Sequence, residues 1–273
     1  MTEQQPHIEA PVSLPAPNFV ETGDERNSCR IAFRRRFPGD AGIGRPGVVW
    51  LGGFKSDMRS TKAQRIDDWA MAHGRASLRF DYGGHGESGG LFEEGTISQW
   101  THQSLALIRA QTEGPQILIG SSMGGWIALL VARELALSGE TDRLAGMVLI
   151  APAVDFTEAL IWANLPETIR RDIMEQGFWK RPSAYANEGY PITRALIEDG
   201  RKHLLLGGVV RSHCPVHILQ GMQDPDVPWA HAMKLVHQMA GDPVALTLVK
   251  DADHRLSREE DIVRLLAAIE GVA

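Results

Sequence analysis

The chain has little of what secreted, membrane-spanning and nucleic-acid-binding proteins need. Its 273 residues include only two cysteines, Cys29 and Cys214, which lie far apart. A disulfide framework is therefore not expected, and a reducing compartment is the default. Lys and Arg (28) are fewer than Asp and Glu (34), giving a net charge of -6, which argues against a general nucleic-acid binder with its basic face. No apolar run is long enough to span a bilayer.

The first residues lack the features of a targeting segment. The stretch MTEQQPHIEAPVSLPAPN has no basic start, no apolar centre and no arginine. It matches neither a secretory signal nor a mitochondrial transit peptide. Its four prolines predict a disordered or extended tail over residues 1–17. We therefore expect a cytoplasmic location.

Apolar runs typical of buried strands alternate with segments of helical periodicity along the rest of the chain. Strands are expected at 30–37, 48–54, 76–82, 115–120, 147–152, 214–221 and 244–252. Helices are expected at 61–73, 97–111, 126–135, 230–239 and 258–269. This alternation predicts an α/β fold with a mostly parallel central sheet and helices on both faces.

Residues 153–210 interrupt the alternation. They contain helical runs at 156–165, 167–176 and 191–206 and no clear strand. We interpret them as a helical cap inserted between two parts of the core, 18–152 and 211–273.

The segment PQILIGSSMGG (115–125) carries the strongest chemical signal. An apolar run leads directly into Gly120-Ser121-Ser122-Met123-Gly124, and a helical run follows. A strand, a G-x-S-x-G turn and a helix together form a nucleophile elbow, whose strained turn exposes the serine hydroxyl above the sheet. Ser122 is therefore the predicted nucleophile. The alternative is a glycine-rich loop with no chemical role.

A serine hydroxyl needs a general base. Of ten histidines, His254 lies just after the last expected strand, where a loop can bring it over the sheet edge. Five others lie in helical runs or within a strand. His85, in the glycine-rich loop 83–90, is the main rival.

The base in turn needs an acid to orient it. Asp224 follows the strand 214–221 and has Val227 three residues later, a turn typical of this role. Asp226 is its close neighbour, and Asp155, after the strand 147–152, ranks third.

Two backbone N–H groups should stabilise the oxyanion that forms when the serine attacks. Met123 follows the nucleophile and supplies the first. Phe54 is the best candidate for the second, because Gly52-Gly53 let the preceding backbone turn toward the site.

These motifs together resemble the α/β-hydrolase superfamily. DYGGHGES (81–88) fits the D-x-x-G-x-G-x-S loop of that family. The resemblance extends, beyond the superfamily, to the branch that contains mitochondrial palmitoyl-protein thioesterase, also described as an acyl-glucuronide esterase. It covers about residues 46–270, including GPQILIGSSMGGW, SDMRSTKA, GMQDPDVPW, DHRLSREED and the cap segment LPETIRRDIMEQGFWKRPSAYANEGY. The chain departs from that branch in two places. One is the N-terminal tail, which lacks a transit peptide. The other is Gly53-Phe54-Lys55-Ser56, where Phe54 stands in place of a Tyr and Lys55 in place of an aliphatic residue.

The resemblance implies a serine hydrolase with Ser122, Asp224 and His254 as its catalytic triad. Its substrates would be carboxylic esters or thioesters, including acyl-glucuronides and S-acylated proteins, and it would need no cofactor and no metal. The alternatives are an acyltransferase on the same fold and an inert binding protein. The predicted partner is only the substrate, a small molecule or an acylated protein.

The cap should set specificity. Its apolar residues can form either an acyl-binding wall or a core of the cap's own. Its basic residues, and Lys55 beside the oxyanion loop, are candidates to bind a carboxylate such as a glucuronate.

Overall fold

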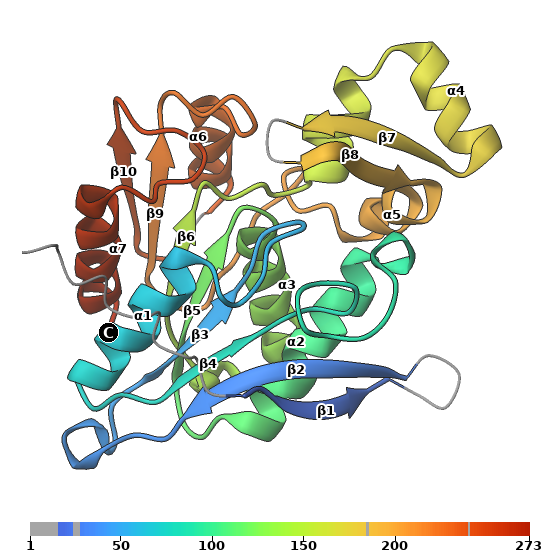
Figure 1. Cartoon of the computed structure of the whole chain (residues 1–273). Coiled ribbons are helices and arrows are strands. Elements are labelled where there is room, and N and C mark those ends of the chain that lie inside the picture. The colour runs from blue at the N-terminus through green and yellow to red at the C-terminus, as the bar shows by residue number, and fades with distance from the viewer. Residues whose placement is uncertain (1–15, 24–27, 184–185, 240) are drawn as a thin grey trace, which may run out of the picture.

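The computed structural model describes residues 16–23, 28–183, 186–239 and 241–273 (Figure 1). Eight strands form one sheet in the order β1-β2-β4-β3-β5-β6-β9-β10. They are β1 (Asn18–Thr22), β2 (Cys29–Arg36), β3 (Gly47–Leu51), β4 (Ser77–Phe80), β5 (Gln116–Ser121), β6 (Leu144–Ile150), β9 (Val216–Gly221) and β10 (Val244–Val249). β1 and β2 pair antiparallel with each other and β2 with β4, and the remaining pairs are parallel.

The central strands β3, β4 and β5 are buried along their whole length because helices cover both faces of the sheet. Every residue of β3 and β5 is buried. Register places Trp50 opposite Ile119 and Leu51 opposite Gly120, so β3 and β5 end side by side. The residues that follow these two strands therefore meet at the same edge of the sheet.

Helices cover the sheet on both faces (Figure 1). The apolar faces of α1 and α7 pack together with one face of the sheet, and those of α2, α3 and α6 pack on the other. The bounds are α1 (Thr61–Ala72), α2 (Ile97–Gln111), α3 (Met123–Leu137), α6 (Trp229–Gln238) and α7 (Glu259–Gly271). The predicted α/β fold is therefore confirmed. In the described part of the chain no helix is long and apolar enough to cross a membrane.

The segment after β6 lies above the carboxyl edge of the sheet, at the upper right of Figure 1. It contains a π-helical turn (Thr157–Ile161), a 3-10 helix (Trp162–Asn164), α4 (Glu167–Gln176), β7 (Phe178–Ser183), β8 (Ala186–Thr193), α5 (Arg194–Gly200) and a 3-10 helix (Arg201–His203). The expectation of a cap without strands was wrong, because β7 and β8 pair antiparallel there.

Hydrogen bonds of two buried aspartates hold this segment together and join it to the core. The Asp155 carboxylate accepts the backbone N–H groups of Leu205 and Leu206, both at 2.8 Å. It thereby ties the beginning of the segment to its end. Asp199 on α5 accepts the backbone N–H of Ser98 at 2.8 Å and so joins the segment to α2. The division into a core (18–152 and 211–273) and a cap (153–210) stays a proposal that these contacts support.

Candidate active site

Ser122 occupies the sharp turn between β5 and α3. Its φ of 54° and ψ of -117° are rare for a residue other than glycine and store backbone strain. The Ser122 N–H donates to the Ile150 carbonyl at 2.8 Å, and the Ser122 carbonyl accepts the Ala153 N–H at 3.0 Å. Bonds to the end of β6 and to the loop after it therefore hold the strained turn in place.

Gly120 and Gly124 are required because the chain passes very close to itself here. A Cβ on Gly120 would collide with the backbone of Gly124. A Cβ on Gly124 would collide with the Leu51 and Gly52 carbonyl oxygens at the end of β3. The G-x-S-x-G spacing is thus a packing requirement that brings β3, β5 and α3 together under Ser122.

His254 lies beside Ser122, on the loop that follows β10. Its Nε2 is 3.1 Å from the Ser122 Oγ, and its Nδ1 is 2.7 Å from the Asp224 Oδ2. An ionised carboxylate only accepts hydrogen bonds, so Nδ1 carries the proton and Nε2 is left to accept the serine hydroxyl. The structure therefore brings together all three residues that the sequence singles out as nucleophile, base and acid.

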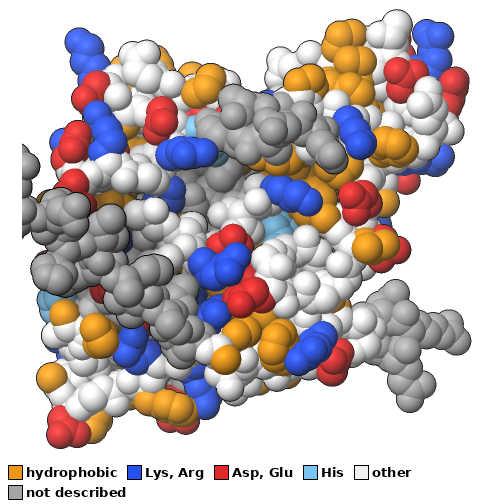
Figure 2. All heavy atoms as spheres, viewed as in Figure 1, with side chains coloured by type: hydrophobic (Ala, Val, Ile, Leu, Met, Phe, Trp, Pro, Cys, Tyr) orange, Lys and Arg blue, Asp and Glu red, His pale blue; other side chains and the backbone are white. Residues whose placement is uncertain are grey.

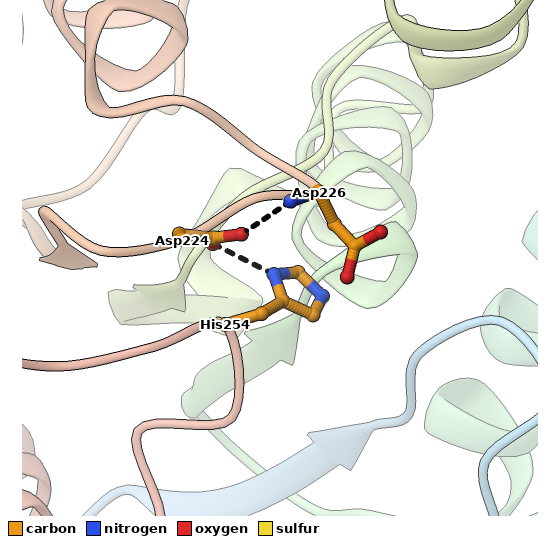
Figure 3. A group of neighbouring side chains, drawn as sticks. All are labelled: Asp224, Asp226 and His254. Carbon is orange, nitrogen blue, oxygen red and sulfur yellow. Dashed lines mark hydrogen bonds and ion pairs between the residues drawn. The ribbon is translucent and has the colours of Figure 1, made fainter. Parts of the chain in front are cut away.

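The Asp224 carboxylate is fully buried and oriented by its own loop. Its Oδ1 accepts the backbone N–H groups of Asp226 at 2.9 Å and Val227 at 2.8 Å. Gln220 donates to its Oδ2 at 3.3 Å. Figure 3 shows the two bonds that link Asp224 to the Asp226 backbone and to the imidazole. These donors fix the orientation of the carboxylate next to His254.

Asp226 lies close to the imidazole but makes different contacts. Its carboxylate stands beside the His254 ring in Figure 3, with no bond drawn between them. The Arg181 guanidinium on β7 lies 3.4 Å from the Asp226 Oδ1. Asp226 therefore connects the cap to the acid loop. Asp155, the third candidate, binds the backbone of Leu205 and Leu206 and does not contact His254 among the described residues.

His85, the rival histidine, orients the loop after β3. Its Nε2 accepts the Lys55 backbone N–H at 3.1 Å, and its Nδ1 lies 3.2 Å from the Gly83 carbonyl. Burial lowers the pKa of His85 to about 4, so it is neutral at pH 7. Nδ1 therefore donates to Gly83, and Nε2 accepts from Lys55. The sequence draws attention to His85 but does not reveal this role.

Phe54 and Met123, the two predicted oxyanion donors, both line the cavity at Ser122. A turn over residues 53–56, closed by the Ser56 N–H to the Gly53 carbonyl at 3.1 Å, presents Phe54. A Cβ on Gly53 would lie only 3.4 Å from the Ser122 Cβ, so this turn runs directly past Ser122. Among the described residues, no hydrogen bond uses the backbone N–H of Phe54 or Met123. Both donors are thus available to a ligand.

The space around Ser122 and His254 divides into two cavities that share these two residues. The first, of about 230 Å³, is mostly apolar and lies under the cap. It is lined by Phe54, Ser122, Met123, Ala153, Phe156, Leu160, Ile161, Arg181, Pro182, Tyr190, Ile192, Pro225, Asp226, Val227 and His254. The second, of about 460 Å³, has mostly polar residue types in its wall and lies between the start of α1 and the His254 loop. Its wall is formed by Trp50, Gly53, Phe54, Lys55, Ser56, Ser60, Thr61, Lys62, Ser121, Ser122, Tyr190, His254, Arg255 and Ser257.

Lys62 on α1 is a site residue that sequence analysis missed. Its Nζ donates to the Arg255 carbonyl and lies 3.3 Å from the Ser257 Oγ, so it braces the loop that carries His254. Burial lowers its pKa to about 8. A single lysine on an otherwise amphipathic helix gives no periodic signal. Only its place within SDMRSTKA could have drawn attention to it.

Asp224, Asp226 and His254 are also the residue types that bind metal ions, and their ligand atoms lie within 4.8 Å of one another. Both imidazole nitrogens already have partners, however, in Asp224 and Ser122. A metal at Nε2 would displace the serine hydroxyl. The contacts of this group therefore fit proton transfer better than metal binding.

The sheet order, the serine turn and the loop histidine define a hydrolase of the α/β class. Residues 36–268 match the Alpha/beta hydrolase family, to which the chain belongs. The family resemblance seen in the motifs is thereby confirmed. Human palmitoyl-protein thioesterase ABHD10, mitochondrial, is 34% identical over 226 residues, which are 82% of this chain and 72% of the relative.

Solved structures agree with this assignment. A putative hydrolase from Agrobacterium vitis S4 is 46% identical with a TM-score of 0.90, covering 95% of this chain and 99% of that one. Mouse alpha/beta hydrolase domain-containing protein 10 is 30% identical with a TM-score of 0.81, covering 93% and 98%. Est1E from Butyrivibrio proteoclasticus, solved with ferulic acid, is 18% identical with a TM-score of 0.73, over 92% and 96%. This last likeness concerns the fold alone.

Proposed function

We propose that the protein is a serine hydrolase that cleaves carboxylic esters or thioesters through an acyl-enzyme. The observation that carries this proposal is the pair of hydrogen bonds from Ser122 to His254 and from His254 to Asp224. The two unused N–H groups above Ser122 and the apolar cavity beside it provide further support. The family relative named as a palmitoyl-protein thioesterase favours S-acyl or related acyl substrates.

In the first half of the reaction His254 Nε2 takes the proton of Ser122 as Oγ attacks the acyl carbonyl carbon. Asp224 stabilises the imidazolium that forms, and the N–H groups of Phe54 and Met123 bind the oxyanion. The bond to the leaving group then breaks. An alcohol leaves with the proton of His254. A thiolate is the weaker base, so it can leave first and then take the same proton, which makes His254 neutral again before water attacks.

In the second half water attacks the acyl-Ser122 ester. His254 takes the proton of that water and returns it to Ser122 as the acid is released. One imidazole therefore makes every proton transfer. It needs its Nδ1 bond to Asp224, and its Nε2 must be unprotonated at the start of each half of the reaction. The continuous arrangement of these groups disfavours an inert binding protein.

The relatives also bear on location. The names of the curated relatives place them in mitochondria. The cytoplasmic location expected from the sequence does not match them and stays a prediction.

Hydrolysis of 4-nitrophenyl esters with acyl chains of two to sixteen carbons tests the proposed function. We expect turnover that Ser122→Ala reduces by about 10⁴-fold or more, because the nucleophile is lost. Ser138→Ala is the matched control, since Ser138 is an exposed serine at the far end of α3 that lines neither cavity. Turnover that survives Ser122→Ala would reject the proposal.

A further inference from the structure

The loop that carries His254 has little support from its own backbone. Residues 253–257 lie in no helix or strand, and among the described residues they make no backbone–backbone hydrogen bond. Leu256 has a φ of 45°, in the left-handed region that costs a residue with a side chain free energy. The conformation of this loop therefore depends on the side chains that bond to its backbone.

Part of that support comes from within the loop. The Asp253 Oδ1 accepts the backbone N–H groups of Arg255 at 3.0 Å and of Leu256 at 3.3 Å. The Ser257 Oγ donates to the Arg255 carbonyl at 3.0 Å. These bonds join near neighbours in the sequence, so they shape the loop without fixing its place over the edge of the sheet.

Lys62 connects the loop to α1. Its ammonium donates to the Arg255 carbonyl and lies 3.3 Å from the Ser257 Oγ. Among the described residues no other side chain from outside the loop bonds to the loop backbone. Arg255 directly follows His254, so this bond acts one peptide unit from the imidazole. The Nε2 of that imidazole lies 3.1 Å from the Ser122 Oγ, a distance that the position of the loop sets.

The surroundings of Lys62 are unfavourable for a charged side chain, so stability alone does not explain it. It is the second residue of α1, and the N-terminal end of a helix repels positive charge. The side chain is buried, and burial lowers its pKa from 10.5 to about 8, with Asp253 and Asp261 opposing the change and Arg255 adding to it. The ammonium is thus charged at pH 7 at a cost in free energy, as is common at functional positions.

We propose that Lys62 is a positioning residue whose ammonium holds the loop over residues 253–257 so that the His254 imidazole faces Ser122. This inference rests on the proposed function and adds to it a residue that acts through His254. Without the ammonium the strained loop relaxes, and fewer molecules keep the His254 Nε2 within reach of the Ser122 Oγ. The loss should appear in kcat, because Lys62 does not line the apolar cavity that is expected to bind the acyl group.

Lys62→Met tests this role, because it removes the charge and the donor and keeps a side chain of similar length. We expect kcat for 4-nitrophenyl butyrate to fall about tenfold or more, as the loss of one charge-assisted hydrogen bond allows, with KM changed less than about threefold. Labelling of Ser122 by a small fluorophosphonate should slow by a similar factor, since it needs the same base. Thermal unfolding should occur at an unchanged or higher temperature, because an apolar side chain replaces a buried charge.

Arg65→Met is the matched control. Arg65 lies on the same helix, three residues after Lys62, and pairs at 2.6 Å with Glu259 at the start of α7, beyond the loop. It lines neither cavity. Its variant should keep kcat and the labelling rate within about twofold, as for other exposed ion pairs. On the face drawn in Figure 2 the visible Lys and Arg side chains are interspersed with Asp and Glu, so no broad patch of one charge would carry the effect of a single substitution.

The pH dependence of kcat provides a readout that a merely structural role would not change. As the pH rises through about 8, Lys62 becomes a neutral amine, which still donates a hydrogen bond but a weaker one. We expect kcat of the parent protein to fall about three- to tenfold to a lower plateau, after subtraction of spontaneous hydrolysis. The decline should be absent in Lys62→Met. It should also be absent in Lys62→Arg, whose guanidinium stays charged, and this variant should regain part of the activity that Lys62→Met loses.

The outcomes separate the role of Lys62 from the proposed function. A parent protein that neither hydrolyses the ester nor is labelled at Ser122 would reject the function itself. An active parent protein with a folded Lys62→Met that keeps kcat and the labelling rate would overturn the positioning role and leave the function intact. Equal losses in Lys62→Met and Arg65→Met would do the same. If Lys62→Met does not fold, an alkaline decline that persists unchanged in Lys62→Arg would overturn the role.

Discussion

The Arg181 guanidinium lies 3.4 Å from the Asp226 carboxylate, two residues after the acid that bonds His254. This ion pair connects strand β7 of the cap to the loop that holds Asp224. Both side chains are about one-third exposed, at 39% and 31%. Its contribution to stability is therefore small, as for other surface ion pairs. The pair matters mainly because it gives Asp226 a partner other than His254.

Separate substitution of the two neighbouring aspartates tests which of them is the acid. Asp224→Asn should lower kcat about 10⁴-fold, because an amide no longer favours the proton on Nδ1. Asp226→Asn should lower it less than about tenfold, because only the pair with Arg181 is lost. Steady-state kinetics on one 4-nitrophenyl ester measures both. A larger effect for Asp226→Asn would assign the acid to Asp226.

Substitution of His85 tests its role in orienting the loop after β3. His85→Leu removes the acceptor for the Lys55 N–H and should lower kcat about 10- to 100-fold, because one oxyanion donor, the Phe54 N–H, is displaced. His85→Gln places an amide oxygen near the position of Nε2 and should restore part of the loss. An unchanged kcat in His85→Leu would show that the turn over residues 53–56 holds Phe54 without help.

The neutral, buried state of His85 predicts a specific pH dependence of stability. Its folded pKa of about 4 lies below the unfolded value of 6.5. Above pH 6.5 neither state is protonated, so the group has no effect. As the pH falls from 6.5 to about 4 the unfolded chain gains the proton first, and the free energy of unfolding drops by up to about 3 kcal/mol.

Urea denaturation of the parent protein and of His85→Gln, measured between pH 7 and pH 4, isolates this contribution. His203, His217 and His231 also have pKa values lowered by burial, but they are the same in both proteins. The parent protein should therefore lose more stability on acidification than the variant does. Parallel stability curves would contradict the assignment of a neutral His85.

The apolar cavity should limit the length of the acyl chain. Leu160 lines it and is partly exposed, so Leu160→Trp should fill part of the cavity with little effect on folding. We expect kcat/KM for a dodecanoyl ester to fall about tenfold relative to an acetyl ester. Leu137→Trp, at a position that is 76% exposed and lines neither cavity, is the control. Equal changes for both esters would place the acyl chain elsewhere.

The sheet and its main helices are predictable from the sequence because their signals are local. The predicted helix over 97–111 coincides with α2, and the strand and turn around Ser122 follow from an apolar run that ends in glycines. Asp224 is recognisable because Val227 donates to its carboxylate across three residues. These features depend on neighbours in the sequence and need no tertiary contact.

The β7–β8 hairpin is not predictable in the same way. It contains Pro182, Pro191 and Gly189, with charged residues in place of an alternating apolar pattern. Pairing between its two strands sustains it, together with the packing of Trp179 and Ile192 on the core. The expected helix over 191–206 begins only at Arg194, after the Thr193 side chain accepts the Leu196 N–H at 3.1 Å.

The contacts between distant segments are equally invisible in the sequence. His85 reaches Lys55 across 30 residues, and Lys62 reaches the Arg255 carbonyl across 193. No spacing rule connects such positions. They meet only because parallel strands end at one edge of the sheet.

Covalent labelling by a fluorophosphonate, mapped by peptide mass spectrometry, tests the central claim most directly. The probe phosphonylates a serine only when a base activates it, so nucleophile, base and fold are examined together. We predict one adduct, on Ser122, that is absent in Ser122→Ala and forms far more slowly in His254→Ala. No adduct on the folded protein, or an adduct on another residue with Ser122 unmodified, would contradict the account.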